Sequence, residues 1–434
     1  MCNHQGIILH LEATRIMTLP ENFINQMRNL LGEATDSFLS AMNEPPSVSI
    51  KINRRKSDNP DICGYEGLTP VKWCPSGYYL RERPVFTLNT LIHAGVFYVQ
   101  DASSMIYEAV TEKIVPIALD TGDPLRVLDL CAAPGGKTTS MINALPDGTT
   151  VVANEFVGNR ATVLKENLMK WGYPDIIVTN SPTARFAALG ELFDIIAVDA
   201  PCSGEGMMRK EDVAVSQWGE GLQKQCASLQ REILADAFEA LKPGGFLIYS
   251  TCTFNRLENE ENVGYLVEEL GMVPLDMTFP EEWGIGKGID TPYPCLRFMP
   301  HITRGEGLFL CVLRKEGDYM PARTRRGKSF SQLIADKAKI IADGIPMTTT
   351  KGRDQVPTTE SALSCDYKRG TLPEVEVDEQ TALSYLRHEA IQLNPEIPKG
   401  YVVVMYKDHP LGIVKNLGNR ANNLYPAQWR IRMK

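Results

Sequence analysis

The stretch Asp129-Leu-Cys-Ala-Ala-Pro-Gly-Gly-Lys-Thr-Thr139 decides the fold, because it joins an apolar run to a helical pattern through a glycine turn. Residues 126–130 are typical of a buried strand, and residues 141–145 continue as a helix. Paired glycines allow a close approach of the backbone to a ligand, and the free N–H groups and positive dipole end of the helix attract negative charge. The sequence therefore predicts that this junction binds a charged ligand.

Four interpretations of this junction compete. A phosphate-binding Walker A loop requires Gly, four residues and then Gly-Lys-Ser/Thr, but Cys131 occupies the position of the first glycine. The dinucleotide pattern G-x-G-x-x-G is also missing from the stretch. The remaining alternatives are a plain strand-to-helix turn and a Gly-Gly turn that holds the amino-acid end and the ribose of S-adenosylmethionine.

Strand-like and helical stretches alternate from Met105 onward. The strand candidates are residues 126–130, 150–154, 175–179, 194–199, 245–250 and 307–313, with helical stretches between the first five. This alternation builds a mostly parallel sheet with helices on both faces, and ligands bind at the carboxyl ends of its strands. We therefore predict an α/β, Rossmann-like catalytic domain over residues 106–315.

Polar and thiol side chains follow several of these strands. Glu155 follows the second strand, where an acid can accept hydrogen bonds from ribose hydroxyls. Asp199 and Cys202 follow the fourth strand, and Cys252 follows the fifth. A lone buried cysteine is usually inert packing, but two thiols at neighbouring strand ends beside an aspartate indicate chemistry. A thiolate that adds to carbon 6 of cytosine makes carbon 5 nucleophilic enough to accept a methyl group. Either Cys252 or Cys202 suits this role.

Composition limits the other possibilities. A chain of 434 residues is expected to form two or three domains. Its net charge of −8 argues against global attraction to nucleic acid, so any basic surface must be local. The ten cysteines include no C-x-x-C pair, so we expect no metal site and reduced thiols in the cytoplasm. No apolar run approaches the length of a membrane span, so no membrane partner is expected, and a monomer is the default.

Smaller domains are expected on both sides of the catalytic domain. We interpret residues 1–16 as an extension before a native start at Met17, and residues 17–105 as an N-terminal α+β domain that recognises RNA. Its basic cluster, at residues 54–56, suits either RNA contact or a charged surface rim.

The C-terminal part divides into a linker and a small domain. Residues 314–353 hold ten basic against four acidic residues, which favours a basic linker over 316–365, either solvated or following phosphates. Its densest part is Arg323, Arg325, Arg326 and Lys328, and residues 348–359 are expected to form a loop. Residues 366–434 resume folded patterning, with a helix at 381–393, strands at 401–406 and 411–415, and a turn at 408–410. Trp429 near the end suits either base stacking or closure of a small core.

Three motifs together resemble one enzyme family. They are Asp-Leu-Cys-Ala-Ala-Pro-Gly-Gly-Lys at 129–137, Asp-Ala-Pro-Cys-Ser-Gly-Glu-Gly at 199–206 and Ser-Thr-Cys-Thr at 250–253. Their order is similar to that of the Nol/Nop/Sun family of RNA 5-methylcytosine methyltransferases. The stretches 19–23 and 98–105 and the C-terminal end, which is similar to a PUA-like RNA-binding domain, resemble the bacterial 16S ribosomal RNA branch. The likeness covers nearly the whole chain from Met17.

The resemblance implies roles for individual residues. It implies that S-adenosylmethionine is held by Cys131, Ala132, Ala133, Pro134, Gly135, Gly136 and Lys137. It further implies that Glu155 binds the ribose and that Asp199 lies near the methyl donor and the target base. Cys252 is then the nucleophile that forms a covalent adduct with carbon 6 of cytosine, and Cys202 assists product release.

The resemblance also implies a substrate. It points to cytosine C5 in 16S ribosomal RNA, near the decoding region, as free RNA or in the 30S subunit. Transfer RNA is an alternative target, and a noncatalytic RNA-binding assembly factor is an alternative class that the intact Cys252, Cys202 and Asp199 disfavour. One departure concerns the adenine side of the cofactor. Relatives carry an acid after the third strand, whereas this chain has Pro182, which offers no side-chain acceptor. We therefore expect either that Asn180 or Ser181 replaces the contact or that the affinity for the cofactor is weaker.

Overall fold

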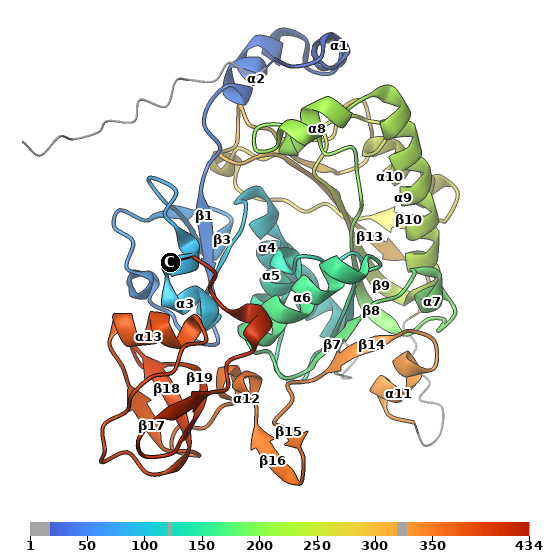
Figure 1. Ribbon diagram of the computed structural model, residues 1–434. Helices are drawn as coiled ribbons and strands as arrows, with labels where there is room; N and C mark the ends of the chain where they lie inside the picture. Colours follow the sequence, from blue (N-terminus) through green and yellow to red (C-terminus); the bar gives the residue numbers. More distant parts are fainter. Residues whose placement is uncertain (1–17, 120–123, 319–327, 434) are drawn as a thin grey trace, which may run out of the picture.

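One large mixed sheet forms the centre of the computed structural model, which describes residues 18–119, 124–318 and 328–433 (Figure 1). Its strand order is β11-β12-β13-β9-β8-β5-β6-β7-β14, and β10 pairs with β13. The central strands run parallel and are β5 (Arg126–Asp129), β6 (Thr150–Asn154), β7 (Ile176–Thr179), β8 (Phe193–Asp199) and β9 (Leu241–Thr251). Antiparallel strands extend one side, namely β10 (Met272–Pro274), β11 (Gly286–Lys287), β12 (Leu296–Phe298) and β13 (Leu308–Lys315). The Rossmann-like α/β prediction is confirmed.

Helices cover both faces of this sheet. The helices are α4 (Ile106–Ala118), α5 (Gly136–Ala144) and α6 (Gly158–Trp171) on one face, and α7 (Ala184–Ala187), α9 (Glu220–Ala240) and α10 (Glu260–Glu268) on the other. Successive residues of a strand point to opposite faces, so Val151 and Ala153 enter one buried core whereas Val152 enters the other. The chain leaves β5 for β6 on one side and reaches β8 on the other, which makes the carboxyl end of β5 a topological switch point, where open α/β sheets bind ligands.

The N-terminal part is an α+β unit, as expected. Its elements are α1 (Glu21–Leu31), α2 (Thr35–Met42), β1 (Ser49–Ile52), β2 (Thr69–Val71), β3 (Cys74–Tyr79), α3 (Thr90–His93) and β4 (Phe97–Val99), with the sheet order β2-β3-β1-β4. The basic cluster is engaged with protein. The Lys56 ammonium donates to the carbonyl oxygens of Ala94 and Lys170, both at 2.7 Å, and Arg55 pairs with Asp147 at 2.5 Å. The cluster therefore fastens this unit to the catalytic domain instead of forming a surface rim.

The segment expected as a basic linker contains regular structure. It forms α11 (Phe330–Ala335), β14 (Ile340–Asp343), the hairpin of β15 (Thr348–Lys351) and β16 (Asp354–Pro357), and α12 (Thr359–Leu363). β14 pairs antiparallel with β7 and so belongs to the large sheet, and the loop expected over 348–359 is wrong. Consecutive β-branched threonines favour a strand, and Gly352 at φ +64° permits the tight turn. Arg323, Arg325 and Arg326 lie outside the described residues, as do the extension 1–16 and Met17.

The C-terminal part is a small β-rich unit. It contains β17 (Glu374–Glu376), α13 (Glu379–Leu386), β18 (Gly400–Tyr406), β19 (His409–Asn416) and β20 (Ala421–Asn423) in the order β17-β18-β19-β20. The helix expected to reach residue 393 is shorter, because His388 adopts a left-handed φ of +66°, which ends a helix. The hairpin turn lies at Lys407 and Asp408, both with positive φ, one residue before the expected turn. Trp429 is buried beside Tyr425, so it closes the small core.

The connection between β8 and α9 contains the remaining helix, α8 (Asp212–Gln217). Figure 1 shows α8 near α1 and α2, above the carboxyl edge of the central strands. The same apolar cluster contains Phe23 and Met27 of α1 together with Met208 and Phe254 of the catalytic domain. The N-terminal helices are therefore packed against the segments that follow β8 and β9.

Candidate active site

A cavity of about 660 Å³ opens at the carboxyl ends of β5, β6, β8 and β9. Predicted site residues in its wall are Cys131, Glu155, Asp199, Cys202 and Cys252. Other lining residues are Leu130, Phe156, Val157, Arg160, Pro182, Thr183, Ala200, Pro201, Gly204, Met207, Leu229 and Ile233. Its size and largely apolar wall with a few polar groups are those of a small-molecule site. The tertiary structure thus brings together residues from four separate strand ends.

The glycine loop lies behind this cavity. Gly135 adopts a φ of +113°, which glycine tolerates best, and α5 begins at the next residue. The amide of Ala132 donates to the carbonyl oxygen of Asn154 at 2.8 Å, and the carbonyl oxygen of Ala133 accepts from Arg160 at 2.9 Å. These bonds hold the loop against β6 and α6. Of residues 131–137, only Cys131 lines the cavity; Ala132, Ala133, Pro134, Gly135, Gly136 and Lys137 do not.

Two buried side chains, Lys51 and Asp129, form hydrogen bonds with the start of α5, next to the glycine loop. Lys51 of β1 is fully buried and donates to the carbonyl oxygen of Gly136 at 2.9 Å, which joins the N-terminal unit to the start of α5. The carboxylate of Asp129, the last residue of β5, accepts the Thr138 hydroxyl at 2.6 Å through one oxygen. Its other oxygen is buried and has no partner among the described residues. Burial, opposed by the Thr138 hydrogen bond and assisted by the charge of Asp199, raises the pKa of Asp129 to about 7.

Asp199 is held through both of its carboxylate oxygens. The Lys137 ammonium lies 2.6 Å from Oδ2, and the Ser250 hydroxyl donates to Oδ1 at 2.8 Å. Ser250 in turn lies 2.8 Å from the hydroxyl of the buried Tyr107. Burial lowers and the charge of Asp199 raises the pKa of Lys137, with a net rise, so Lys137 remains a cation. The carboxylate is therefore oriented and partly exposed to the cavity.

The thiols of Cys202 and Cys252 face each other with their sulfur atoms 3.1 Å apart. Both are free cysteines and are half-buried. The hydrogen bond from Cys252, together with burial, raises the pKa of the Cys202 thiol well above its ordinary value. Cys202 is therefore held in its protonated form, as a proton donor beside the other sulfur.

Glu205 is a residue of the site that the motif analysis left without a role. It is fully buried, and its Oε2 accepts from the backbone amides of Phe254 and Asn255 at 2.6 and 2.9 Å. Its Oε1 accepts from the side chains of Gln26, Trp218 and Gln223 at 2.8, 2.9 and 2.8 Å. A carboxylate with five donors fixes the turn that follows Cys252. An acid inside an apolar, glycine-rich motif was the signal that could have identified it.

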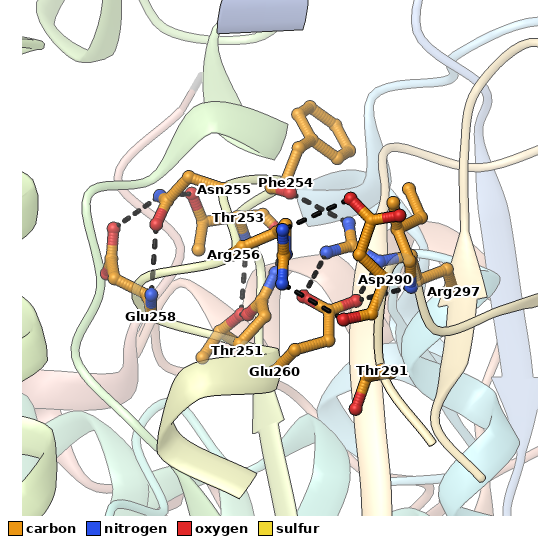
Figure 2. Close-up of polar contacts among 12 residues, drawn as sticks. Thr251, Thr253, Phe254, Asn255, Arg256, Glu258, Glu260, Asp290, Thr291 and Arg297 are labelled. Carbon is orange, nitrogen blue, oxygen red and sulfur yellow. Dashed lines mark hydrogen bonds and ion pairs between the residues drawn. The ribbon is translucent and has the colours of Figure 1, made fainter. Parts of the chain in front are cut away.

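Further contacts fix the turn after Cys252 from the opposite side (Figure 2). Asn255 donates to Glu258 at 2.7 Å and accepts from the backbone amide of Glu258 at 3.0 Å. The buried Arg297 donates to the carbonyl oxygen of Phe254 at 2.7 Å and pairs with Glu260 at 2.5 Å. Because the Cys252 backbone is anchored by this network, its sulfur has a defined position at the cavity.

Asn180, Ser181 and Pro182 follow β7, at the expected adenine side of the cavity. Asn180 donates to the carbonyl oxygens of Glu155 and Phe156, both at 2.8 Å, and the Ser181 hydroxyl accepts from the amide of Lys339 at 2.8 Å. Neither side chain lines the cavity. Both side chains are used to tie the end of β7 to its neighbours. Pro182 does line the cavity, and the neighbouring Thr183 hydroxyl is bound to Asp236 at 2.5 Å.

Glu155 and Phe156 lie next to this part of the cavity. The Glu155 carboxylate lies in the cavity wall and accepts from the amide of Val157 at 2.8 Å through Oε1. Its Oε2 lies 3.6 Å from Arg160, at the distance of a weak ion pair. Phe156 is largely exposed beside it, and its aromatic ring offers an apolar face to a ligand.

Fold and site together define a Rossmann-like methyltransferase. A methyltransferase homolog from Pyrococcus horikoshii superimposes with a TM-score of 0.55, 25% identity and coverage of 68% of this chain and 95% of that one. NSun6 from Pyrococcus horikoshii, solved with SFG, an S-adenosylmethionine analogue, gives a TM-score of 0.58 at 21% identity and covers 70% and 100%. The fold is thus that of S-adenosylmethionine-dependent methyltransferases.

The family follows from the sequence relatives. Residues 116–314 match the 16S rRNA methyltransferase RsmB/F family, residues 19–102 the N-terminal domain of 16S rRNA methyltransferase RsmF, and residues 372–431 the RsmF PUA domain. The ribosomal RNA small subunit methyltransferase F of Enterobacter sp. (strain 638) is 31% identical over 96% of this chain and 97% of its own length. That of Salmonella agona is 36% identical over 81% and 72%. The chain belongs to this family of 16S ribosomal RNA methyltransferases.

Two other findings concern the described residues only. No group of three or more His, Cys, Asp or Glu side chains that could hold a metal ion occurs among residues 18–119, 124–318 and 328–433. Within those same ranges, no helix is long and apolar enough to cross a membrane.

Proposed function

We propose that this protein transfers a methyl group from S-adenosylmethionine to carbon 5 of a cytosine in 16S ribosomal RNA, near the decoding region. The observation that carries the proposal is the pair of sulfur atoms 3.1 Å apart beside Asp199, in the wall of a cavity that Glu155 and Cys131 also line. The names of the relatives, which specify the small ribosomal subunit, support the choice of RNA.

The residues around the cavity fit the cofactor. Cys131 and Glu155 lie at the ends of adjacent strands, where the ribose and the amino-acid end of S-adenosylmethionine would be held, and the exposed ring of Phe156 suits contact with an adenine. The glycine loop would approach the cofactor through its backbone. When bound, S-adenosylmethionine supplies the electrophilic methyl group.

In the proposed reaction, the Cys252 thiolate adds to carbon 6 of the cytosine and forms a sulfur–carbon bond. The electron pair of the 5,6 double bond is thereby made available at carbon 5. Carbon 5 would form the new bond to the methyl group while the bond between that methyl group and the sulfonium sulfur of S-adenosylmethionine broke, and S-adenosylhomocysteine would leave. Asp199 is held by Lys137 and Ser250. In the proposed reaction it stabilises the adduct by a contact with ring nitrogen 3 of the cytosine.

Release requires loss of the proton on carbon 5 and cleavage of the sulfur–carbon bond. Cys202 lies next to the Cys252 sulfur. Its thiol first gives its own proton to water, and the resulting thiolate, a strong base because its pKa is raised, then takes the proton from carbon 5. Loss of the proton restores the double bond and expels the Cys252 thiolate. The two thiols therefore have different roles, addition for Cys252 and release for Cys202.

Bisulfite sequencing of 16S ribosomal RNA and transfer RNA from a deletion strain, with and without the restored gene, tests the proposal. The expected result is a cytosine in 16S ribosomal RNA that loses its protection in the deletion strain. Loss of protection in transfer RNA instead would support the alternative substrate. If purified protein transferred no methyl group to 30S subunits or to 16S RNA from that strain, a noncatalytic assembly role would replace the proposed one.

A further inference from the structure

A second cavity, of about 510 Å³, lies between α1, the start of α9 and the turn after Cys252. Most of its lining residues have polar side chains, namely Asn22, Asn25, Gln26, Asn29, Glu220, Gln223, Lys224, Asn255, Arg256 and Asp290, together with Trp218. Helix α9 contributes to both cavities, with Lys224 in this one and Leu229 in the first. Five residues of α-helix span about 7.5 Å, roughly two nucleotides of a stacked strand at about 3.4 Å each. The two cavities are therefore neighbours along α9, within the reach of adjacent nucleotides.

Helix α1 presents a face of amide side chains to this cavity. Asn22, Asn25, Gln26 and Asn29 recur at the spacing that places residues on one side of a helix. The apolar side of the helix, with Phe23 and Met27, packs into the same core as Phe254, which lies two residues after Cys252. The amides are therefore held in a defined position relative to the nucleophile candidate.

The polar groups of this wall are only partly used. Gln26 is bound to Glu205 and Gln223, but the exposed side chains of Asn22 and Asn29 make no hydrogen bond to the described residues. Arg256 contacts Asp290 through its terminal nitrogens at 3.1 and 3.0 Å (Figure 2), while its buried Nε has no partner there. A wall of amide donors and acceptors, together with a guanidinium N–H that has no partner among the described residues, suits a polar ligand.

The remaining lining residues suit a nucleotide. Trp218 is half-buried, with its Nε1 bound to Glu205 and its ring edge-to-face with Phe23, so part of the indole faces the cavity. An aromatic ring of this kind stacks on unpaired bases. Asparagine and glutamine amides recognise base edges through paired hydrogen bonds, and the exposed Lys224 suits a phosphate.

We propose that this second cavity binds the base of an unpaired nucleotide close to the target cytosine in the RNA, read by the amide face of α1. The inference rests on the proposed function, because a cytosine must leave its stack before a thiol can reach carbon 6. Its neighbours in the strand then lose their stacking partner, and a pocket beside the active site compensates that loss. A protein ligand is disfavoured because the lining offers amides and a partly exposed indole instead of a continuous apolar groove.

Photo-crosslinking tests the placement. A p-benzoylphenylalanine in place of Asn29 is expected to crosslink to 16S RNA in 30S subunits from the deletion strain, within about two nucleotides of the cytosine mapped by bisulfite sequencing. The same probe in place of Glu33, which is exposed just beyond α1 and outside the cavity lining, is the control and should give no crosslink there. A crosslink from position 29 to a distant part of the RNA, or none, would overturn the proposal.

A double variant, Asn25→Ala with Asn29→Ala, tests the chemistry of recognition. Both side chains are exposed, and only Asn25 has a side-chain partner, Arg28. We expect kcat/KM on 30S subunits to fall about 5- to 150-fold, the range for loss of a specific base contact, with S-adenosylmethionine affinity unchanged. Unchanged kcat/KM would contradict the proposal, as would an equal loss in Glu33→Ala.

RNA binding separates this proposal from the reaction chemistry. Affinity of the double variant for 16S RNA, measured without S-adenosylmethionine, should fall whether or not methyl transfer occurs. If the wild-type protein formed no 5-methylcytosine but bound RNA through Asn25 and Asn29, the reaction would be wrong and the nucleotide site would stand. Formation of 5-methylcytosine with unaltered RNA affinity and kcat/KM in the double variant would refute the nucleotide site alone.

Discussion

The sulfur atoms of Cys202 and Cys252 lie 3.1 Å apart although fifty residues separate them in the chain. The parallel register that places Asp199 of β8 opposite Ser250 of β9 makes the segments after both strands run side by side. The amide of Gly206 then donates to the carbonyl oxygen of Cys252 at 2.8 Å. A Cβ at Gly206 would lie 2.7 Å from that oxygen, so only glycine permits this approach. The backbone thus sets the distance between the thiols.

The two cysteines are expected to respond differently to substitution. Cys252→Ala removes the group that adds to the base, so methyl transfer to 30S subunits should fall to background in an assay with radiolabelled S-adenosylmethionine. Cys202→Ala leaves addition possible but removes the neighbouring acid–base group, so a covalent protein–RNA complex should accumulate on denaturing gels. Normal turnover by Cys252→Ala would contradict the assignment, and trapping by Cys252→Ala instead would exchange the roles.

Glu205→Gln is expected to disturb the position of Cys252. The amide NH2 of glutamine must face hydrogen-bond donors on one side of the site, because both carboxylate oxygens accept in the native protein. We expect a loss of about 3 kcal/mol of stability and a fall in kcat of at least about tenfold, with S-adenosylmethionine affinity retained. Calorimetry, single-turnover kinetics and titration of the cofactor check this. Glu211→Gln, at an exposed position before α8, is the matched control, and a normal kcat in Glu205→Gln would sink the idea.

Pro182→Asp is expected to strengthen cofactor binding. Pro182 lies in the cavity wall and its side chain has no acceptor, so an aspartate there would add an acidic acceptor to the proposed cofactor site. A hydrogen bond to a charged group contributes about 2 kcal/mol, which predicts a Kd for S-adenosylmethionine lower by roughly tenfold to thirtyfold. Isothermal titration measures the effect, and Pro182→Ala separates the new carboxylate from the loss of the ring. Equal affinities for Pro182→Asp and the native protein would show that the cofactor does not need the contact.

Asp129→Asn is expected to change how stability depends on pH. Because burial raises the pKa of Asp129 to about 7, the folded protein binds a proton between pH 3.8 and 7 that the unfolded chain has released. The contribution of this group is therefore fully present below about pH 4 and is lost as pH rises toward 7. Asparagine has no such titration, so the variant should gain stability relative to the native protein across that window. Between pH 4 and pH above 7, the gain of the variant over the native protein should grow by on the order of 4 kcal/mol.

Thermal unfolding of both proteins from pH 4 to pH 8 measures this difference. Asp58→Asn, at an exposed position, should follow the native curve. A constant difference in Tm between Asp129→Asn and the native protein across the whole range would contradict the raised pKa.

Much of the central sheet could be predicted from the sequence. The strand expected at residues 150–154 is the observed β6, and those expected at 126–130 and 194–199 differ from β5 and β8 by one residue. Apolar runs and the glycine turn after Asp129 are local signals, since they depend on the side-chain period of the chain and the backbone freedom of glycine. The clustering of Glu155, Asp199, Cys202 and Cys252 at one edge follows from the parallel topology.

Only the tertiary structure determines the contacts between residues that are far apart in the chain. Gln26 and Phe254 both donate hydrogen bonds to the buried Glu205. Lys56 joins two domains by donating to backbone carbonyl oxygens in each. Strand β14 pairs with β7, where Ile340 lies opposite Thr179. The side chains of Asn180 and Ser181 are likewise bound to partners far away in the chain. The physical reason is that local patterns determine which elements form and which side chains are apolar. The partners of a buried polar group depend on long-range packing, which no local pattern records.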